Sequence, residues 1–151
     1  MTERTHSTLV NGERHIWVVS RLWALAADLP VFDYPVDAFS GFDLDIWYGH
    51  INTPTVRSVV EHMRRINAAD LQYPIVLSET GMVMDGVHRL CRAMVEGKES
   101  VRAVQFVTNP EPDRVEGVVE RGVEKQPNAR VRISGGMQLP SPIMSDAPTS
   151  R

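Results

Sequence analysis

Residues 81–98, GMVMDGVHRLCRAMVEGK, carry the most informative pattern in this chain. A short apolar run, MVM, stands before Asp85 and Gly86, and apolar residues at helical spacing follow as far as Gly97. Glycine is favoured just past a helix end, where the backbone turns left-handed. The stretch therefore predicts a strand, a tight junction and a helix over residues 86–96.

The residues before this stretch predict a hairpin partner and a longer helix. YPIVLS (73–78) has the composition of a strand, and ETG (79–81) is typical of the turn that returns the chain. The segment 53–66 predicts a helix with Thr53 as its cap and Pro54 in its first turn. We expect this helix to bury an apolar stripe formed by Val56, Val59, Val60 and Met63.

Three further segments complete the expected domain. Ser20 is a candidate cap for a helix that Pro30 ends, while RHIWVV (14–19) fits either a strand or the first turn of that helix. VFDYPV (31–36) predicts a strand whose proline suits an edge or a strand end, and VRAVQFV (101–107) predicts a last strand. Helices and strands in this order indicate an α+β (or α/β) domain.

Composition bounds the class of protein. A length of 151 residues suits one domain, and 42% hydrophobic with 23% charged residues is ordinary for a globular chain. The net charge of -3 does not favour nucleic-acid binding, and no apolar run approaches the ~20 residues that cross a bilayer. Since the N-terminal residues do not resemble a secretory signal, we expect a cytoplasmic protein without a membrane partner. A single cysteine, Cys91, excludes an intrachain disulfide.

Aromatic residues and prolines divide the chain unevenly. All ten aromatic residues lie at or before Phe106, and six of the ten prolines lie after it. A segment without aromatic side chains buries little area to offset the entropy of ordering. We therefore expect a folded domain over residues 1–107 and a largely flexible extension over 108–151.

The junction at residues 85–89 carries residue types that suit an anion. Backbone N–H groups at a helix start attract phosphate, and Gly86 would let it approach without a Cβ in the way. Arg89 can offer a two-pronged donor, and His88 can donate or move a proton near neutral pH. Asp85 can cap the helix, orient His88 or hold Mg²⁺. The alternative is a plain cap with a surface pair of His88 and Arg89.

This element order, with DGVHRL at a hairpin-to-helix junction and VRAVQF after it, resembles the ParB/sulfiredoxin-like superfamily over roughly residues 31–107. The resemblance implies a free-standing domain with a small mixed sheet and packed helices. In that superfamily, partition proteins bind CTP, sulfiredoxins bind ATP, and a free serine kinase carries Asp-Gly-His-His-Arg. The resemblance thus implies a nucleotide (ATP, ADP or CTP) with Mg²⁺, held by Asp85, Gly86, Val87, His88 and Arg89.

Two departures from the superfamily narrow these implications. Val87 stands where a sulfiredoxin has its catalytic cysteine, so a reductase of that kind is not expected. Nothing after residue 107 looks like the helix-turn-helix domain of partition proteins, so a chromosome-partition role is doubtful.

An acidic loop, GFDLDIWYGH (41–50), is the second candidate feature. In the resembling kinase this loop supplies the catalytic carboxylate, so the resemblance implies catalytic roles for Asp43 and Asp45 beside His88. The alternative is a solvated loop anchored by its apolar residues. We expect His62, on the helix 53–66, to be exposed or lightly packed.

Three functional hypotheses follow. The first is a nucleotide-binding enzyme, a Mg²⁺-dependent phosphotransferase or nucleoside-triphosphatase. The second is a non-catalytic module in which a nucleotide controls binding to another protein or to a second copy of the chain. The third is a ParB-like DNA-binding or nuclease-related protein, against which the net charge of -3 counts.

Overall fold

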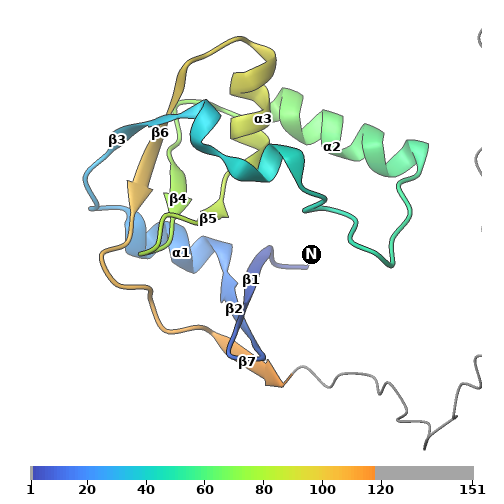
Figure 1. Ribbon diagram of the computed structural model, residues 1–151. Helices are drawn as coiled ribbons and strands as arrows, with labels where there is room; N and C mark the ends of the chain where they lie inside the picture. The colour runs from blue at the N-terminus through green and yellow to red at the C-terminus, as the bar shows by residue number, and fades with distance from the viewer. Residues whose placement is uncertain (1, 118–151) are drawn as a thin grey trace, which may run out of the picture. The chain divides into compact units, whose positions relative to one another are not determined.

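The computed structural model describes residues 2–117, which form three α-helices, two short 3-10 helices and two β-sheets (Figure 1). This confirms the predicted α+β class. The strand at Arg114–Gly117 lies beyond the boundary that we expected at residue 107. The rest of the expected extension, 118–151, lies outside the described residues.

The larger sheet contains the strands that the sequence predicted. Its order is β3-β6-β4-β5, with β6 parallel to β4 and the other neighbours antiparallel. Pro35 ends an edge strand, where a missing N–H breaks no ladder. The bounds are β3 Phe32–Pro35, β4 Ile75–Leu77, β5 Val83–Asp85 and β6 Ser100–Gln105.

The smaller sheet was not predicted. It has the order β1-β2-β7 and consists of β1 Thr5–Val10, β2 Glu13–Val18 and β7 Arg114–Gly117. Asn11 and Gly12 join β1 to β2 with φ values of 52° and 84°. An Asn-Gly pair between two strands is a strong hairpin signal, because this tight turn needs positive φ at both positions. The signal was therefore present in the sequence.

The helices α1 and α3 follow directly from strands. The segment 14–19 is mostly strand β2, and α1 (Val19–Ala26) starts immediately after it, so the prediction of Ser20 as its cap was wrong. Ser20 instead donates its hydroxyl to Glu3. Helix α3 (Val87–Val95) ends as predicted: Gly97 has a φ of 67°, and the amide of Lys98 donates to the Ala93 carbonyl.

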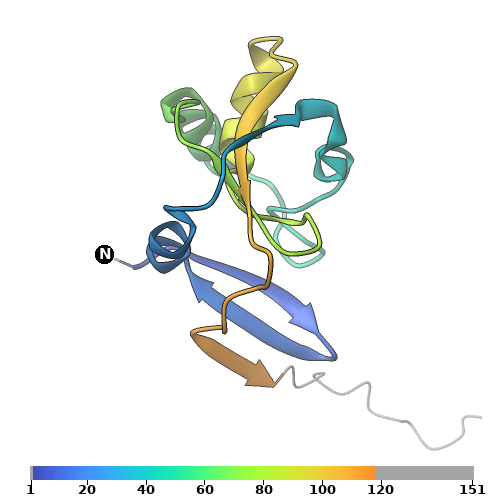
Figure 2. The same cartoon turned by 90° about the vertical axis from the view of Figure 1, so that its left-hand side faces the viewer.

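Two core clusters lie on opposite faces of the larger sheet, because neighbouring strand residues alternate between its faces. One cluster, against α1, consists of Trp17, Leu22, Ala26, Val76, Met84, Val104 and Phe106. The other, against α3 and η1 (Val36–Ala38), consists of Val36, Ile75, Leu77, Leu90, Ala93, Val101 and Ala103. Figure 2 shows α1 and the smaller sheet at the end of the domain away from α3.

Helix α2 (Val56–Ala68) forms as predicted but packs differently. Its cap is Thr55, which exchanges hydrogen bonds with Ser58, so the prediction of Thr53 was wrong. Among the described residues, none of α2 is buried, and the helix extends away from the sheets in Figure 1. The predicted buried stripe is exposed, with exposed fractions of 84, 44, 39 and 55% for Val56, Val59, Val60 and Met63. The sequence predicted the apolar stripe correctly, but the prediction that the domain buries it was wrong.

Candidate functional site

An open groove of about 1280 Å³ runs past the β5–α3 junction. We call it the junction groove. Its walls come from the segment before β1, from α1, from α2, from the turn before β4 and from the junction itself. The side chains relevant to its chemistry are Arg4, Trp23, Arg65, Tyr73, Asp85, His88 and Arg89.

Asp85, the last residue of β5, is the acceptor at the centre of this groove. Its Oδ2 accepts hydrogen bonds from Arg89 Nη2 at 2.7 Å and from Trp23 Nε1 at 2.8 Å. Its Oδ1 accepts from Arg4 Nη2 at 3.1 Å. Three elements are thus tied to one carboxylate. Asp85 is also not the residue that begins α3, since Gly86 occupies the N-cap position.

Arg89 is buried and forms an ion pair with Asp85 inside the domain. Only 9% of its surface is exposed, and Arg89 Nε has no hydrogen-bond partner among the described residues. Its guanidinium lies 5.7 Å from the Trp23 ring centroid, in the range of a cation–π contact. The sequence predicted a two-pronged donor for phosphate, whereas one prong of Arg89 holds Asp85.

Gly86 is required for a reason other than the one that the sequence suggested. Its φ is 114°, a left-handed value that favours glycine. A Cβ at this position would lie 2.5 Å from Ile75 Cγ2 and 3.1 Å from Arg89 Nη2. Glycine therefore allows the junction to pack on β4 and on the Asp85–Arg89 pair, so room for a ligand is not needed to explain it.

His88 pairs with a residue that we expected to be exposed or lightly packed. His88 Nε2 lies 3.0 Å from His62 Nδ1 on α2. The indole of Trp47 lies over both rings, within 11° of parallel, at centroid distances of 3.9 Å from His62 and 5.4 Å from His88. Burial, and then the charges of His62, Arg65 and Arg4, lower the pKa of His88 against an opposing effect of Asp85. Burial and Arg65 also lower the pKa of His62.

Two further features of the groove are an arginine without a partner among the described residues and a pair of nearly parallel aromatic rings. Arg65 has no ion-pair or hydrogen-bond partner within residues 2–117. The rings of Trp23 and Tyr73 lie 5° from parallel with centroids 6.4 Å apart, and both side chains are exposed. Arg65 and two partly exposed aromatic side chains therefore border the same open space, with the guanidinium groups of Arg4 and Arg89 each 5.7 Å from the centroid of Trp23.

Asp43 and Asp45 lie beside a different hollow. This hollow, of about 530 Å³, also contacts Cys91 on α3. It adjoins the junction groove, with which it shares six lining residues: Phe39, Gly41, Leu44, Ile46, Trp47 and Val87. Asp45 accepts a hydrogen bond from the Tyr48 amide at 2.9 Å. In the part of the chain that the structure describes, no three or more His, Cys, Asp or Glu side chains gather as metal ligands.

The junction therefore brings together only part of the predicted site. Asp85 and Arg89 meet as partners of each other, and His88 stands beside them facing α2. Sequence reasoning missed Arg4, Trp23, Trp47 and Tyr73, which line the groove, and it missed the pairing of His62 with His88. They come from segments far apart in the chain, so spacing carries no signal for them.

Comparisons of the chain with protein-family models, with curated proteins and with solved structures found no match. Among the described residues, no helix is long and apolar enough to cross a membrane.

Proposed function

We propose that this protein binds a nucleotide, or a similar ligand with a phosphate and a flat ring, in the junction groove. The observation that carries the proposal is the shared wall of the groove. There Arg65, which has no partner within residues 2–117, and the partly exposed rings of Trp23 and Tyr73 border one open space. The predicted cytoplasmic location belongs to the same proposal, as does the resemblance to the ParB/sulfiredoxin-like superfamily.

The residues suit the two chemical parts of such a ligand. Arginine binds phosphate oxygens through its planar, permanently charged guanidinium group. The side chain of Arg65 lines the groove and can offer this group to a ligand. The first amides of α3, beside His88, lie at the positive end of the helix. Aromatic faces stack on nucleobases in a way that tolerates different bases. These features support binding without favouring ATP, ADP or CTP.

The same residues fit Mg²⁺ poorly. Both oxygens of Asp85 already accept hydrogen bonds, from Arg4, Arg89 and Trp23, and a metal ion would have to displace them. Asp43 and Asp45 line the neighbouring hollow. We therefore propose a binding module whose ligand acts on its conformation or partners, and we assign no phosphoryl-transfer step.

Calorimetric titration with ATP, ADP, CTP and inorganic phosphate, each with and without Mg²⁺, tests the proposal. Arg65→Ala should weaken nucleotide binding about tenfold or more, because it removes a charge-assisted hydrogen-bond donor. Arg64→Ala is the matched control, since Arg64 lies on the same helix but pairs with Glu61 at 3.3 Å. Equal affinities for both variants, or no binding of any nucleotide at millimolar concentration, would refute the proposal.

Phosphate release under the same conditions separates binding from catalysis. A binding module gives saturable binding and no release above the buffer rate. Turnover that Asp43→Asn or Asp45→Asn abolishes would instead restore the catalytic hypothesis for the acidic loop.

A further inference from the structure

The exposed stripe of α2 is an apolar surface without a partner in the described domain. Val56, Val59, Val60 and Met63 follow the i, i+3, i+4, i+7 spacing by which a helix lays one face against another surface. Each is at least 39% exposed, whereas an amphipathic helix of this kind normally buries such a stripe. A contiguous exposed patch of this type marks an interaction site.

A complementary surface lies on the same domain. The hollow beside η2 (Ser40–Asp43), which we call the acidic hollow, has the two carboxylates of Asp43 and Asp45 in its lining. The rest of its lining is mainly apolar: Phe39, Gly41, Phe42, Leu44, Ile46, Trp47, Tyr48, Pro54, Val87 and Cys91. Leu44 and Ile46 are 63 and 45% exposed, so this surface also presents apolar area to solvent.

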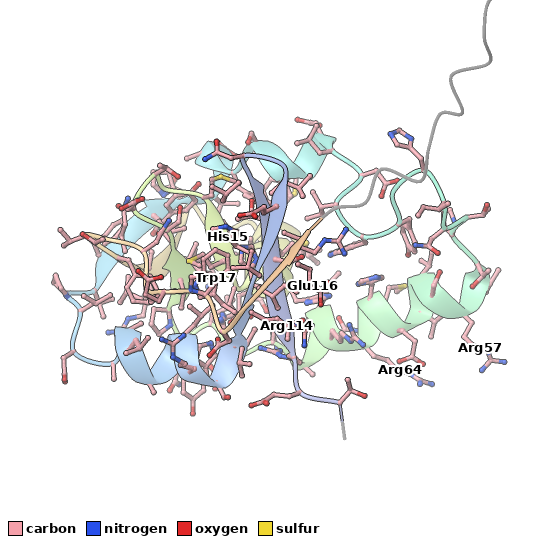
Figure 3. The ribbon with its side chains drawn as sticks, turned by 90° about the horizontal axis from the view of Figure 1, so that it is seen from below. His15, Trp17, Arg57, Arg64, Arg114 and Glu116 are labelled. Atoms are coloured by element: carbon pink, nitrogen blue, oxygen red, sulfur yellow. The ribbon has the colours of Figure 1, made fainter. Side chains whose placement is uncertain are left out.

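The two surfaces carry opposite charge. Arg57 and Arg64 lie three residues before and four residues after Val60, so both are its neighbours on the helix surface. Arg64 is paired with Glu61 at 3.3 Å, so Arg57 carries the positive charge beside the stripe. Figure 3 shows both arginines on α2 pointing away from the body of the domain. An apolar stripe bordered by Arg57 thus matches an apolar hollow lined by aspartates.

We propose that a second copy of this chain covers the stripe, with α2 of each copy seated on the acidic hollow of the other. Pro54 lines the hollow, and Val56 begins the stripe two residues later. Because the surfaces adjoin within one chain, a two-fold axis near Pro54 forms both contacts at once, as closed dimers require. Pairing stripe with stripe would instead bring the arginines of both copies together. This dimer does not depend on nucleotide binding.

Analytical ultracentrifugation across a concentration series tests the interface. The wild-type chain should dimerise, and Val60→Asp should shift the dimer dissociation constant upward at least tenfold. Val107→Asp is the matched control, because Val107 is 89% exposed and lies outside both surfaces. Thermal melts of both variants check that they fold. A wild-type chain that stays monomeric at hundreds of micromolar, or an unchanged constant for folded Val60→Asp, overturns the proposal.

A charge exchange tests which surfaces meet. Arg57→Glu alone and Asp43→Arg alone should each weaken the dimer, since each places like charges across both contacts. An equimolar mixture of the two variants should dimerise again, because opposite charges then face each other at both contacts of the mixed dimer. Failure of the mixture to recover, with a dimeric wild type, overturns the pairing of stripe with hollow.

Discussion

His62 Nδ1 and His88 Nε2 face each other at 3.0 Å beneath the indole of Trp47. The ring centroids are 5.3 Å apart and the planes differ by 20°, so the two imidazoles lie nearly end to end. One nitrogen donates a proton and the other accepts it, an arrangement that double protonation destroys. The pair joins α2 and α3. Trp47, in the acidic loop, stacks on both histidine rings and so holds the loop against the pair.

Stability should fall as the pH drops below the unfolded histidine pKa of about 6.5. Folding lowers the pKa of both His62 and His88. Below about pH 6.5, the unfolded chain therefore binds more protons than the folded chain, and the free energy of unfolding decreases. Melting temperature measured between pH 8 and pH 5 should therefore decrease toward acid. His62→Phe, which keeps an aromatic ring under Trp47, should flatten this decrease.

His6 provides the control for this pH dependence, because burial also lowers its pKa, against an opposing effect of Asp85, while its ring lies beside Trp17 and makes no hydrogen bond with His62 or His88 among the described residues. His6→Phe should leave the contribution of the His62–His88 pair intact. Equal flattening by His6→Phe and His62→Phe, or a melting temperature independent of pH in the wild type, would contradict the assignment. Trp47 fluorescence across the same range reports whether the loop separates from the pair.

The Asp85–Arg89 pair should be a structural element rather than a dispensable site. Arg89→Ala leaves Asp85 with only one of its two cationic partners in a largely buried position, and breaking a buried ion pair costs about 3–5 kcal/mol. Urea denaturation should show a loss of that order. Arg4→Ala should cost well under half as much, since Arg4 is largely exposed. Similar losses for both variants would show that Arg89 is not the main partner.

Gly86→Ala should destabilise the domain more than Gly97→Ala does. Both positions have positive φ, which costs an alanine about 1–2 kcal/mol. Only at Gly86 would the new Cβ also meet Ile75, whereas at Gly97 it meets no atom within 4 Å among the described residues. Equal losses in urea denaturation would mean that the contact with Ile75 relaxes freely.

Asp43→Asn should leave nucleotide affinity within about twofold of the wild type, because Asp43 lines the acidic hollow and not the junction groove. Calorimetric titration measures this directly. A tenfold loss would place Asp43 at the ligand and return it to the role that the superfamily resemblance implies.

Elements with local signals could be located from the sequence alone. Alternating and helical apolar spacing located the larger sheet and all three helices, and Gly97 marked the end of α3. The Asn11–Gly12 pair is an equally local signal for the β1–β2 turn. Helix caps were less certain. Thr55 rather than Thr53 caps α2, because the chain has two threonines two residues apart, and Ser20 was wrong because α1 follows directly from β2, with Val18 at the N-cap and no side-chain cap.

The contacts of the candidate site residues could be known only from the packed domain. Asp85, Gly86, His88 and Arg89 were recognisable from their spacing, but their partners are Arg4, Trp23, Ile75 and His62, on other elements. The stripe of α2 was likewise visible in the sequence, while its exposure was not. Spacing along a chain specifies which side chains share a face. Which surface that face meets depends on how the elements pack, and residues distant in sequence supply that surface.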